Sequence, residues 1–365
     1  MIKLIKPYIT FHEVEEDFKR IFESGTFTKG EYVNKFLQEI KTYLGVDHAF
    51  LTTSATTALT MCLKSLGIGL GDEVIVSDFS FPATVNVVED IGAMPIFADV
   101  DQDTFNMKSE ELEKKITKKT KAVIFVDAFG NPSGISKIKG ICEKHQIPLI
   151  EDAACAIGSS ENGVKVGKIA DLTCFSFHPR KLLTTGEGGV ITTNKKEIAE
   201  IMSVKLNHGA IVRDGMADFI NYGYNYRLSE LQAAMGIKQL NKLESIVKSR
   251  NSIADEYKKR LHLLGFKRQN SLDNVIHNIQ SLVFMVPEGM NRDHLITYLT
   301  ENGIESTIGT YCLSNTTYYK NKYNSVQPIA KYLEKNTVTL PCYDNVDHKY
   351  ISNIIEKYVR TLVED

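Results

Sequence analysis

The chain has 365 residues, 43% of them apolar, and its formal net charge at pH 7 is −2. These values describe a globular protein long enough for a large domain plus a smaller one, and they exclude an intrinsically disordered chain. Lysine and arginine are scattered rather than gathered in one stripe, so charge gives no reason to expect nucleic acid or an anionic membrane as a partner. We therefore expect small-molecule substrates.

The six cysteines lie far apart and form no C-x-x-C pair, which argues against a zinc site or a redox motif, and we expect no bound metal. The first residues lack the long apolar segment of a secretion signal. No later run reaches the roughly 20 apolar residues that a membrane span needs. This combination favours a cytoplasmic protein.

Apolar spacing predicts a helix within residues 8–23, and small polar residues predict a loop at 24–30. From Ala49 to about Thr193, short apolar runs alternate with helical stretches. Strands that alternate with helices predict a largely parallel α/β sheet. The expected strands are Glu73–Ser77, Pro95–Val100, Ala122–Asp127, Pro148–Glu151, Cys174–Phe177 and Gly189–Thr192.

Residues 230–264 are rich in Leu, Ile, Lys and Glu and predict one or two long helices that lead out of the sheet domain. We therefore expect a large α/β domain with an N-terminal arm at residues 1–240 and a small α+β domain at residues 241–365. The elements expected in the small domain are a strand at Asn278–Val286 and helices at Asp293–Asn302 and Lys349–Leu362.

Candidate functional residues follow the expected strands, because ligands of parallel α/β sheets bind beyond the carboxyl ends of the strands. The strand that ends at Phe177 is followed by Lys181 and by a glycine-rich turn at Gly186–Gly189. Taken alone, these residues are typical of a solvated surface lysine and a hairpin turn. Their spacing matches neither the dinucleotide-binding nor the Walker pattern.

Asp152 follows the apolar run Pro148–Ile150, which places a carboxylate at another strand end in the same cleft. A carboxylate that faces a pyridinium nitrogen keeps it protonated and lets a cofactor ring act as an electron sink for carbanions. A loop carboxylate that caps the next helix is an equally good interpretation of this residue by itself.

The hydroxyl-rich stretch Thr52–Leu59 opens an apolar helix that runs to Leu66. The free N–H groups and the dipole of such a helix start bind anions such as phosphate, although Ser and Thr are also ordinary helix caps. Phe81 follows another strand and lies beside the same cleft, where it can stack on a cofactor ring. A single aromatic residue more often belongs to a core.

Taken in order, these elements resemble the DegT/DnrJ/EryC1/StrS family of pyridoxal-phosphate enzymes, best known as sugar aminotransferases. The resemblance spans nearly the whole chain and implies the aspartate-aminotransferase fold (PLP-dependent transferase type I), with a large, mixed but mostly parallel sheet domain and a small α+β domain. Further matching segments are Ser24-Gly25, Lys29-Gly30, Gly71–Ile75, Asp99–Asp101, Asn207–Gly209, Gly223–Ala234 and Leu340-Pro341.

The resemblance implies a role for each candidate residue. Lys181 is the catalytic residue and binds pyridoxal 5′-phosphate as a Schiff base. Asp152 is the partner of the pyridine nitrogen, and Phe81 stacks on the ring.

The phosphate of the cofactor is expected at Ala55 and Thr56, through backbone groups and the Thr56 hydroxyl, and at the Ser176 side chain. Asn225 is expected to reach the phosphate in the neighbouring subunit's site, because the family builds its active sites across a homodimer interface.

Three positions depart from the family pattern. Cys155 stands where the family often has Gln or His in contact with the cofactor's phenolic oxygen, and a thiol is a weak donor. Ser54-Ala55-Thr56 replaces the usual Ser-Gly-Thr but keeps the backbone donors. The segment Gly309–Ser314 replaces a His/Tyr/Pro-rich loop that many members acting on nucleotide sugars share, which leaves the acceptor substrate open.

The resemblance implies that an amino group passes from L-glutamate to the keto group of a sugar, with pyridoxamine 5′-phosphate formed during turnover. A nucleotide-linked keto-deoxy sugar of surface-polysaccharide or glycan biosynthesis is the expected acceptor. The alternative is a smaller ketone, such as dihydroxyacetone phosphate or a keto sugar without a nucleotide. Lys181 argues against a dehydratase of the same fold, in which histidine replaces the lysine. The joint presence of Asp152, Ser176 and Asn225 argues against a non-catalytic regulatory protein.

Overall fold

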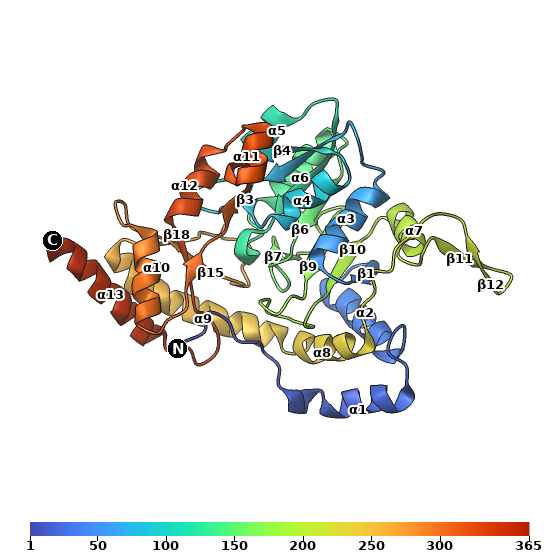
Figure 1. Cartoon of the computed structure of the whole chain (residues 1–365), viewed down its shortest axis with the longest axis horizontal. Helices are drawn as coiled ribbons and strands as arrows, with labels where there is room; N and C mark the ends of the chain where they lie inside the picture. The colour runs from blue at the N-terminus through green and yellow to red at the C-terminus, as the bar shows by residue number, and fades with distance from the viewer. Residues whose placement is uncertain (365) are drawn as a thin grey trace.

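The computed structural model describes residues 1–364 of the chain. Its centre is a seven-stranded sheet, in which five neighbouring strands pair in parallel and one strand near an edge, the second in the order below, runs antiparallel to both of its neighbours (Figure 1). In sheet order the strands are β1 (His48–Thr52), β10 (Gly189–Thr193), β9 (Leu172–Ser176), β6 (Leu149–Asp152), β5 (Thr120–Val126), β2 (Glu73–Ser77) and β4 (Met94–Ala98). The mixed, mostly parallel sheet expected from the sequence is confirmed.

Helices cover both faces of this sheet, which is why its strands are apolar along their whole length rather than at alternate positions. Along β2, Val74 and Val76 pack on the face covered by α3 (Ala55–Ser65), α4 (Ala83–Asp90) and α7 (Lys196–Lys205). Ile75 points to the other face. That face is covered by α5 (Ser109–Lys115), α6 (Ile135–Lys144), α2 (Glu31–Leu44) and α8 (Glu230–Leu240).

All six strands predicted for this region are present, each within two residues of the predicted ends. The sequence analysis did not predict β1, in which the apolar run covers only Ala49–Leu51. The helix predicted within residues 8–23 begins only at Glu15, as α1 (Glu15–Ser24), so the prediction was wrong for residues 8–14. A short 3-10 helix, η1 (Phe11–Glu13), precedes it. The Glu13 carboxylate caps its start by accepting a hydrogen bond from the Thr10 N–H.

The C-terminal part is built on a four-stranded antiparallel sheet in the order β13 (Lys267–Arg268), β15 (Leu282–Met285), β18 (Thr337–Leu340) and β16 (Thr307–Ile308). Helices α9 (Leu243–Leu261), α10 (Arg292–Glu301) and α13 (His348–Glu364) pack on it, and α9 reaches back toward α8 (Figure 1). We propose the domain boundary in the break between α8 and α9, near residue 240.

The strand predicted at Asn278–Val286 is shorter than expected. Residues 278–281 do not pair in the sheet, and the Asn278 and Gln280 side chains and the Ser281 N–H bind loops of the large sheet part instead. Asn278 Nδ2 donates to the Cys155 and Ile157 carbonyl oxygens, both at 2.8 Å. The remaining short elements are η2 (Ala128–Gly130), η3 (His262–Leu264), η4 (Leu313–Asn315), α11 (Thr317–Tyr323), α12 (Pro328–Asn336), β3 (Phe79–Ser80), β7 (Ser160–Glu161), β8 (Val164–Lys165), β11 (Ala210–Arg213), β12 (Met216–Phe219), β14 (Val275–Ile276) and β17 (Tyr311–Cys312). Within residues 1–364, no helix combines the length and the apolar character needed to cross a membrane.

Asp78 ties the C-terminal part to the large sheet. Its carboxylate accepts from the Ser314 N–H at 2.7 Å, the Ser314 hydroxyl at 2.6 Å and the Cys312 thiol at 3.2 Å, and β17 pairs with β3 beside it. Burial raises the pKa of Asp78 to about 7, although the hydrogen bonds from Ser314 and Cys312 oppose the rise. The folded protein therefore holds a proton here that the unfolded chain releases near pH 4.

This proton makes stability depend on pH. Between about pH 4 and 7 the folded state binds more protons than the unfolded state, so the free energy of unfolding falls as pH rises, by at most about 1.4 kcal/mol per pH unit for one group. We expect Asp78→Asn to make this slope shallower. Urea unfolding of both proteins between pH 5 and 8 measures it. An identical slope in the variant would show that Asp78 is ionised throughout.

Candidate active site

A cavity of about 460 Å³ opens at the carboxyl ends of β9, β6 and β5. Every candidate from the sequence lines it except Asn225. These lining residues are Ala55, Thr56, Phe81, Asp152, Cys155, Ser176 and Lys181. The parallel strands thus bring together residues that lie more than a hundred positions apart in the chain, at the edge where ligands of α/β sheets bind.

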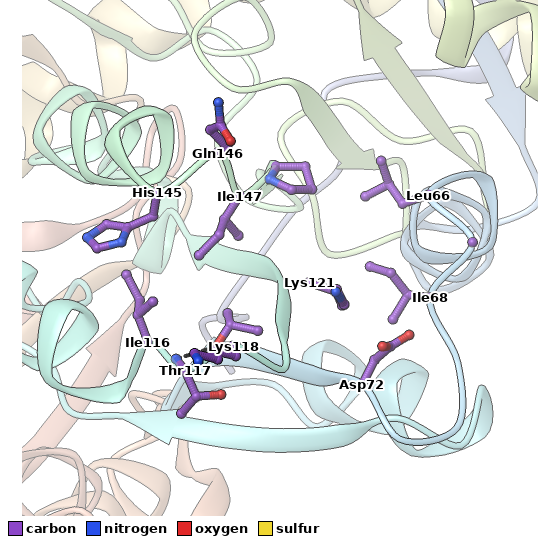
Figure 2. Close-up of a pocket in the computed structure, with 13 residues that line it drawn as sticks. Leu66, Ile68, Asp72, Ile116, Thr117, Lys118, Lys121, His145, Gln146 and Ile147 are labelled. Carbon is purple, nitrogen blue, oxygen red and sulfur yellow. Dashed lines mark hydrogen bonds between the residues drawn. The ribbon is translucent and has the colours of Figure 1, made fainter.

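A second hollow, of about 980 Å³, lies at the opposite edge of the sheet (Figure 2). Asp72, just before β2, Thr120, at the start of β5, and Pro148, just before β6, line it together with Lys121 and His145. None of the candidate residues lines this hollow. The chemistry expected from the sequence therefore belongs to the smaller cavity.

Lys181 lies in the loop that follows β9. Its backbone N–H donates to the His178 carbonyl at 2.9 Å, which closes a turn. Gln280, from the C-terminal half, clamps this loop, because its amide accepts from the Leu182 N–H at 2.9 Å and donates to the Arg180 carbonyl at 2.8 Å. Lys181 Nζ lies 3.0 Å from Cys155 Sγ. The amine is therefore held inside the cavity rather than extended into solvent.

Asp152, the last residue of β6, is buried and held on both oxygens. Thr84 Oγ1 donates to Oδ2 at 2.6 Å, and the Ala154 N–H donates to Oδ1 at 3.3 Å. Burial raises the pKa of Asp152, while Thr84, Ala154 and the positive charge of Lys181 act against the rise. A cationic ring nitrogen bound next to this carboxylate would further favour its ionised form.

The start of α3 forms an anion site at one side of the cavity. Ser54 caps the helix by accepting from the Thr57 N–H, and the N–H groups of Ala55 and Thr56, the first two of the helix, are left for a ligand. Ser176 ends β9 beside them and also lines the cavity. Gly189 lets these segments meet, because a Cβ atom there would lie 2.7 Å from the Ser54 carbonyl carbon.

Phe81 follows β3 and is 66% exposed, although it lines the cavity. Its ring centre lies 6.4 Å from that of Tyr311, in the strand paired with β3. An aromatic ring that stands open at a cavity mouth offers a face for stacking.

Asn225 does not line the cavity of its own chain. It is exposed and follows the hairpin of β11 and β12, which extends away from the body of the molecule (Figure 1). This position agrees with a role in a neighbouring subunit, which stays a prediction.

The sequence analysis did not assign a function to several other residues that line the cavity. Thr84 holds Asp152, Asp127 follows β5, and His178 and Arg180 precede Lys181 in the same loop. Only Arg180 could have been found from the sequence, because it stands directly before Lys181. The contact between Thr84 and Asp152 joins residues that are distant in the sequence, so no spacing pattern reveals it.

The chain matches the model of the DegT/DnrJ/EryC1/StrS aminotransferase family over residues 10–359. It is 33% identical over 367 residues to a GDP-perosamine synthase of Vibrio cholerae, covering 98% of this chain and 99% of the relative. Two solved structures share the fold. A putative sugar aminotransferase from Streptococcus pneumoniae in its PMP form has a TM-score of 0.92 and 27% identity, covering 99% of this chain and 100% of the other. Helicobacter pylori PseC, an aminotransferase of pseudoaminic acid biosynthesis, has a TM-score of 0.90 and 26% identity, covering 99% of each chain.

These matches extend over almost the whole chain and agree with the cavity, in which an amine, a carboxylate and a helix start converge. The fold class and the cofactor expected from the sequence are both confirmed. The chain belongs to the DegT/DnrJ/EryC1/StrS aminotransferase family and is a pyridoxal-phosphate-dependent aminotransferase.

Proposed function

We propose that this enzyme transfers an amino group from L-glutamate to the keto group of a nucleotide-linked keto-deoxy sugar, for surface-polysaccharide or glycan biosynthesis. The observation that carries the proposal is the placement of Lys181 and Asp152 in one cavity at the carboxyl edge of the sheet. An amine that can form an imine and a buried carboxylate that can face a ring nitrogen are the two groups that transamination needs from the protein.

The residues of the cavity fit pyridoxal phosphate. Lys181 would hold its aldehyde carbon, Asp152 its ring nitrogen, and the start of α3 with Ser176 its phosphate, while Phe81 would cover one ring face. When bound, the cofactor supplies an electron sink for the pair of electrons left when a C–H bond next to nitrogen breaks.

The chain's own residues then move the proton. With the amino donor bound, the Lys181 Nζ would take the proton from the donor's Cα and return one in the acceptor's half of the cycle. Asp152 would hold the ring nitrogen in its protonated form. Thr84 and the Ala154 N–H hold the carboxylate in place. Cys155 lies 3.0 Å from Nζ and helps to position the amine.

Arg180 is suited to bind an anionic group of a substrate. It lines the cavity next to Lys181, and its guanidinium forms no ion pair among the described residues. A guanidinium binds a carboxylate or a phosphate through two parallel hydrogen bonds. The L-glutamate carboxylate and the phosphates of a nucleotide sugar both fit this requirement.

The relatives' names favour a nucleotide-linked acceptor, since one is named for GDP-perosamine and another, SpsC of Bacillus subtilis, for spore coat polysaccharide. The divergent segment Gly309–Ser314 leaves room for the second candidate, a smaller ketone, and one of its residues, Thr310, lines the cavity. A half-reaction screen separates the two. The pyridoxamine form of the enzyme is mixed with each ketone, and return of the aldehyde-form absorbance identifies the acceptor.

We further propose that the enzyme acts as a homodimer. The hairpin of β11 and β12 exposes several large apolar side chains, although an isolated two-stranded hairpin cannot bury such residues by itself. These side chains are Val212, Met216, Phe219, Ile220 and Tyr222, each between 53% and 76% exposed. A second copy that covers this hairpin would also bring Asn225 to the phosphate of its partner's site.

A cytoplasmic location is our remaining proposal. It is supported by the six cysteines, which are all free in the described structure, as is usual in a reducing compartment.

The first prediction concerns Lys181. Lys181→Ala should abolish both the visible absorbance of the bound cofactor and all turnover, because no other amine can form the imine. Lys181→Arg keeps the charge but cannot form the imine, so it should fail equally. Lys196→Ala, at an exposed lysine on α7, is the matched control and should behave as wild type. Normal turnover in Lys181→Ala would end the proposal.

The second prediction concerns Thr84. Thr84→Val removes the hydroxyl that donates to Asp152 but keeps the shape of the side chain. Hydrogen bonds to charged groups contribute about 1.5–3 kcal/mol, so cofactor affinity should fall roughly 10- to 100-fold. Thr84→Ser keeps the donor and should stay close to wild type. Fluorescence titration of cofactor-free protein measures this, and equal affinities in all three proteins would refute the role of Thr84.

The third prediction concerns the hairpin. Phe219→Asp should convert the dimer to a monomer and lower activity, because a charge would replace an apolar side chain in the interface. Leu70→Asp is the control, since Leu70 is 93% exposed and lies away from the hairpin. Sedimentation velocity gives the mass of each variant. A Phe219→Asp protein that remains a fully active dimer would place the interface elsewhere.

A further inference from the structure

Asp127 is a buried carboxyl group that the proposed mechanism leaves unused. It follows β5 directly, its backbone N–H donates to the Asp152 carbonyl at 3.2 Å, and its side chain is 0% exposed although it lines the cavity. Neither of its carboxyl oxygens has a hydrogen-bond partner among residues 1–364. An unpaired buried carboxyl group is costly, so it requires a partner, which a protonated neighbour and a ligand in the cavity can both supply.

Glu151 lies on the neighbouring strand β6, close enough to Asp127 for its charge to repel that of Asp127. It is fully buried in β6, where Oε2 accepts from Thr173 Oγ1 at 2.7 Å and from the Gly167 N–H at 3.3 Å. Its Oε1 has no partner among the described residues. Two ionised carboxylates have no proton to share and cannot form a hydrogen bond with each other. If Glu151 carries a proton on Oε1, it can donate a hydrogen bond to Asp127. If Asp127 is protonated as well, Asp127 can donate a hydrogen bond into the cavity.

Burial favours this proton-loaded state. Burial, and then repulsion by Glu151, raises the pKa of Asp127 well above its usual range. Burial raises the pKa of Glu151 to about 7, against the opposing hydrogen bonds from Thr173 and Gly167. Around neutral pH the pair therefore carries protons and is able to act as a donor.

The order of the strands tells which edge of the cofactor Asp127 would meet. The phosphate site lies on the β9 side of Asp152, at Ser176 and the start of α3, while Asp127 lies on the opposite side, at the end of β5. In pyridoxal phosphate the phosphate arm and the phenolic oxygen flank the aldehyde carbon on opposite sides. With the aldehyde carbon at Lys181 and the nitrogen at Asp152, the phenolic oxygen faces the Asp127 side of the cavity.

We propose that Asp127, backed by Glu151, donates a hydrogen bond to the phenolic oxygen of the bound cofactor and replaces the contact for which Cys155 is too weak a donor. Cys155 remains beside Lys181 Nζ, its partner at 3.0 Å. The inference rests on the proposed cofactor site and adds to it a residue that binds one atom of the ring.

The test compares the affinity of cofactor-free protein for pyridoxal phosphate with its affinity for the analogue that lacks the 3-hydroxyl group. A lost hydrogen bond of this kind corresponds to about a tenfold change or more. We expect the ratio of the two affinities to fall at least about tenfold in Asp127→Leu relative to wild type, because the variant has no donor. Asp127→Asn keeps an N–H donor and should retain the ratio.

Two further variants exclude a general effect of removing buried carboxyl groups or of poor folding. Asp78→Asn removes a buried carboxyl group that does not line the cavity, and its ratio should equal that of wild type. In Glu151→Gln, the glutamine amide donates its N–H to Asp127, so Asp127 stays ionised and has no proton to donate to the cofactor. The ratio of the two affinities should therefore fall in this variant too, which keeps the test valid if Asp127→Leu does not fold.

The outcomes separate the inference from the site on which it rests. Wild type that does not bind pyridoxal phosphate would refute the site itself. Wild type that binds it, with an unchanged ratio in Asp127→Leu and Glu151→Gln, would overturn the inference alone. A ratio that falls in Cys155→Ala and not in Asp127→Leu would return the contact to Cys155.

Discussion

The burial of the Asp152 carboxylate at the end of β6 is the constraint on which the active site depends. A carboxylate loses its hydration there and keeps its charge only if the protein and the ligand replace it. Thr84 and the Ala154 N–H supply part of the replacement, and the positive charge of Lys181 supplies another part. In the proposed function, the pyridinium nitrogen of the bound cofactor completes it. The same burial that destabilises the empty site thus favours the cofactor.

The sheet explains how this constraint is met. Its parallel strands end at one edge, so the residues after β9, β6 and β5 surround one cavity, and the start of α3 adds an anion site. The C-terminal part holds these segments in place. Gln280 bonds to the loop of Lys181, and Ser314 bonds to Asp78. The loop that carries Lys181 is therefore positioned by a residue about a hundred positions away.

Much of this site was predictable from the sequence, because strand ends are visible as apolar runs and the residues after them are few. Lys181 and Asp152 were singled out in this way, and a phosphate site at Thr52–Leu59 from a helix start. The individual roles of Ser176, Ala55 and Thr56 came from the family resemblance. The contacts between Thr84 and Asp152 and between Asp127 and Glu151 were not predictable, since they depend on which strands lie side by side and in what register. The role of Asn225 depends on a second subunit, which one chain does not contain.

A single-turnover experiment on Asp152→Asn tests most directly whether Asp152 and Lys181 act together on one ring. Asparagine keeps the size of the side chain but cannot hold a protonated ring nitrogen by charge. Rapid mixing of the cofactor-loaded enzyme with L-glutamate gives the rate at which the aldehyde-form absorbance disappears. Removing a group that stabilises charge in a transition state costs roughly 100- to 1,000-fold in rate, and we expect a loss of at least this size. A rate equal to that of wild type, with the cofactor bound, would contradict the account.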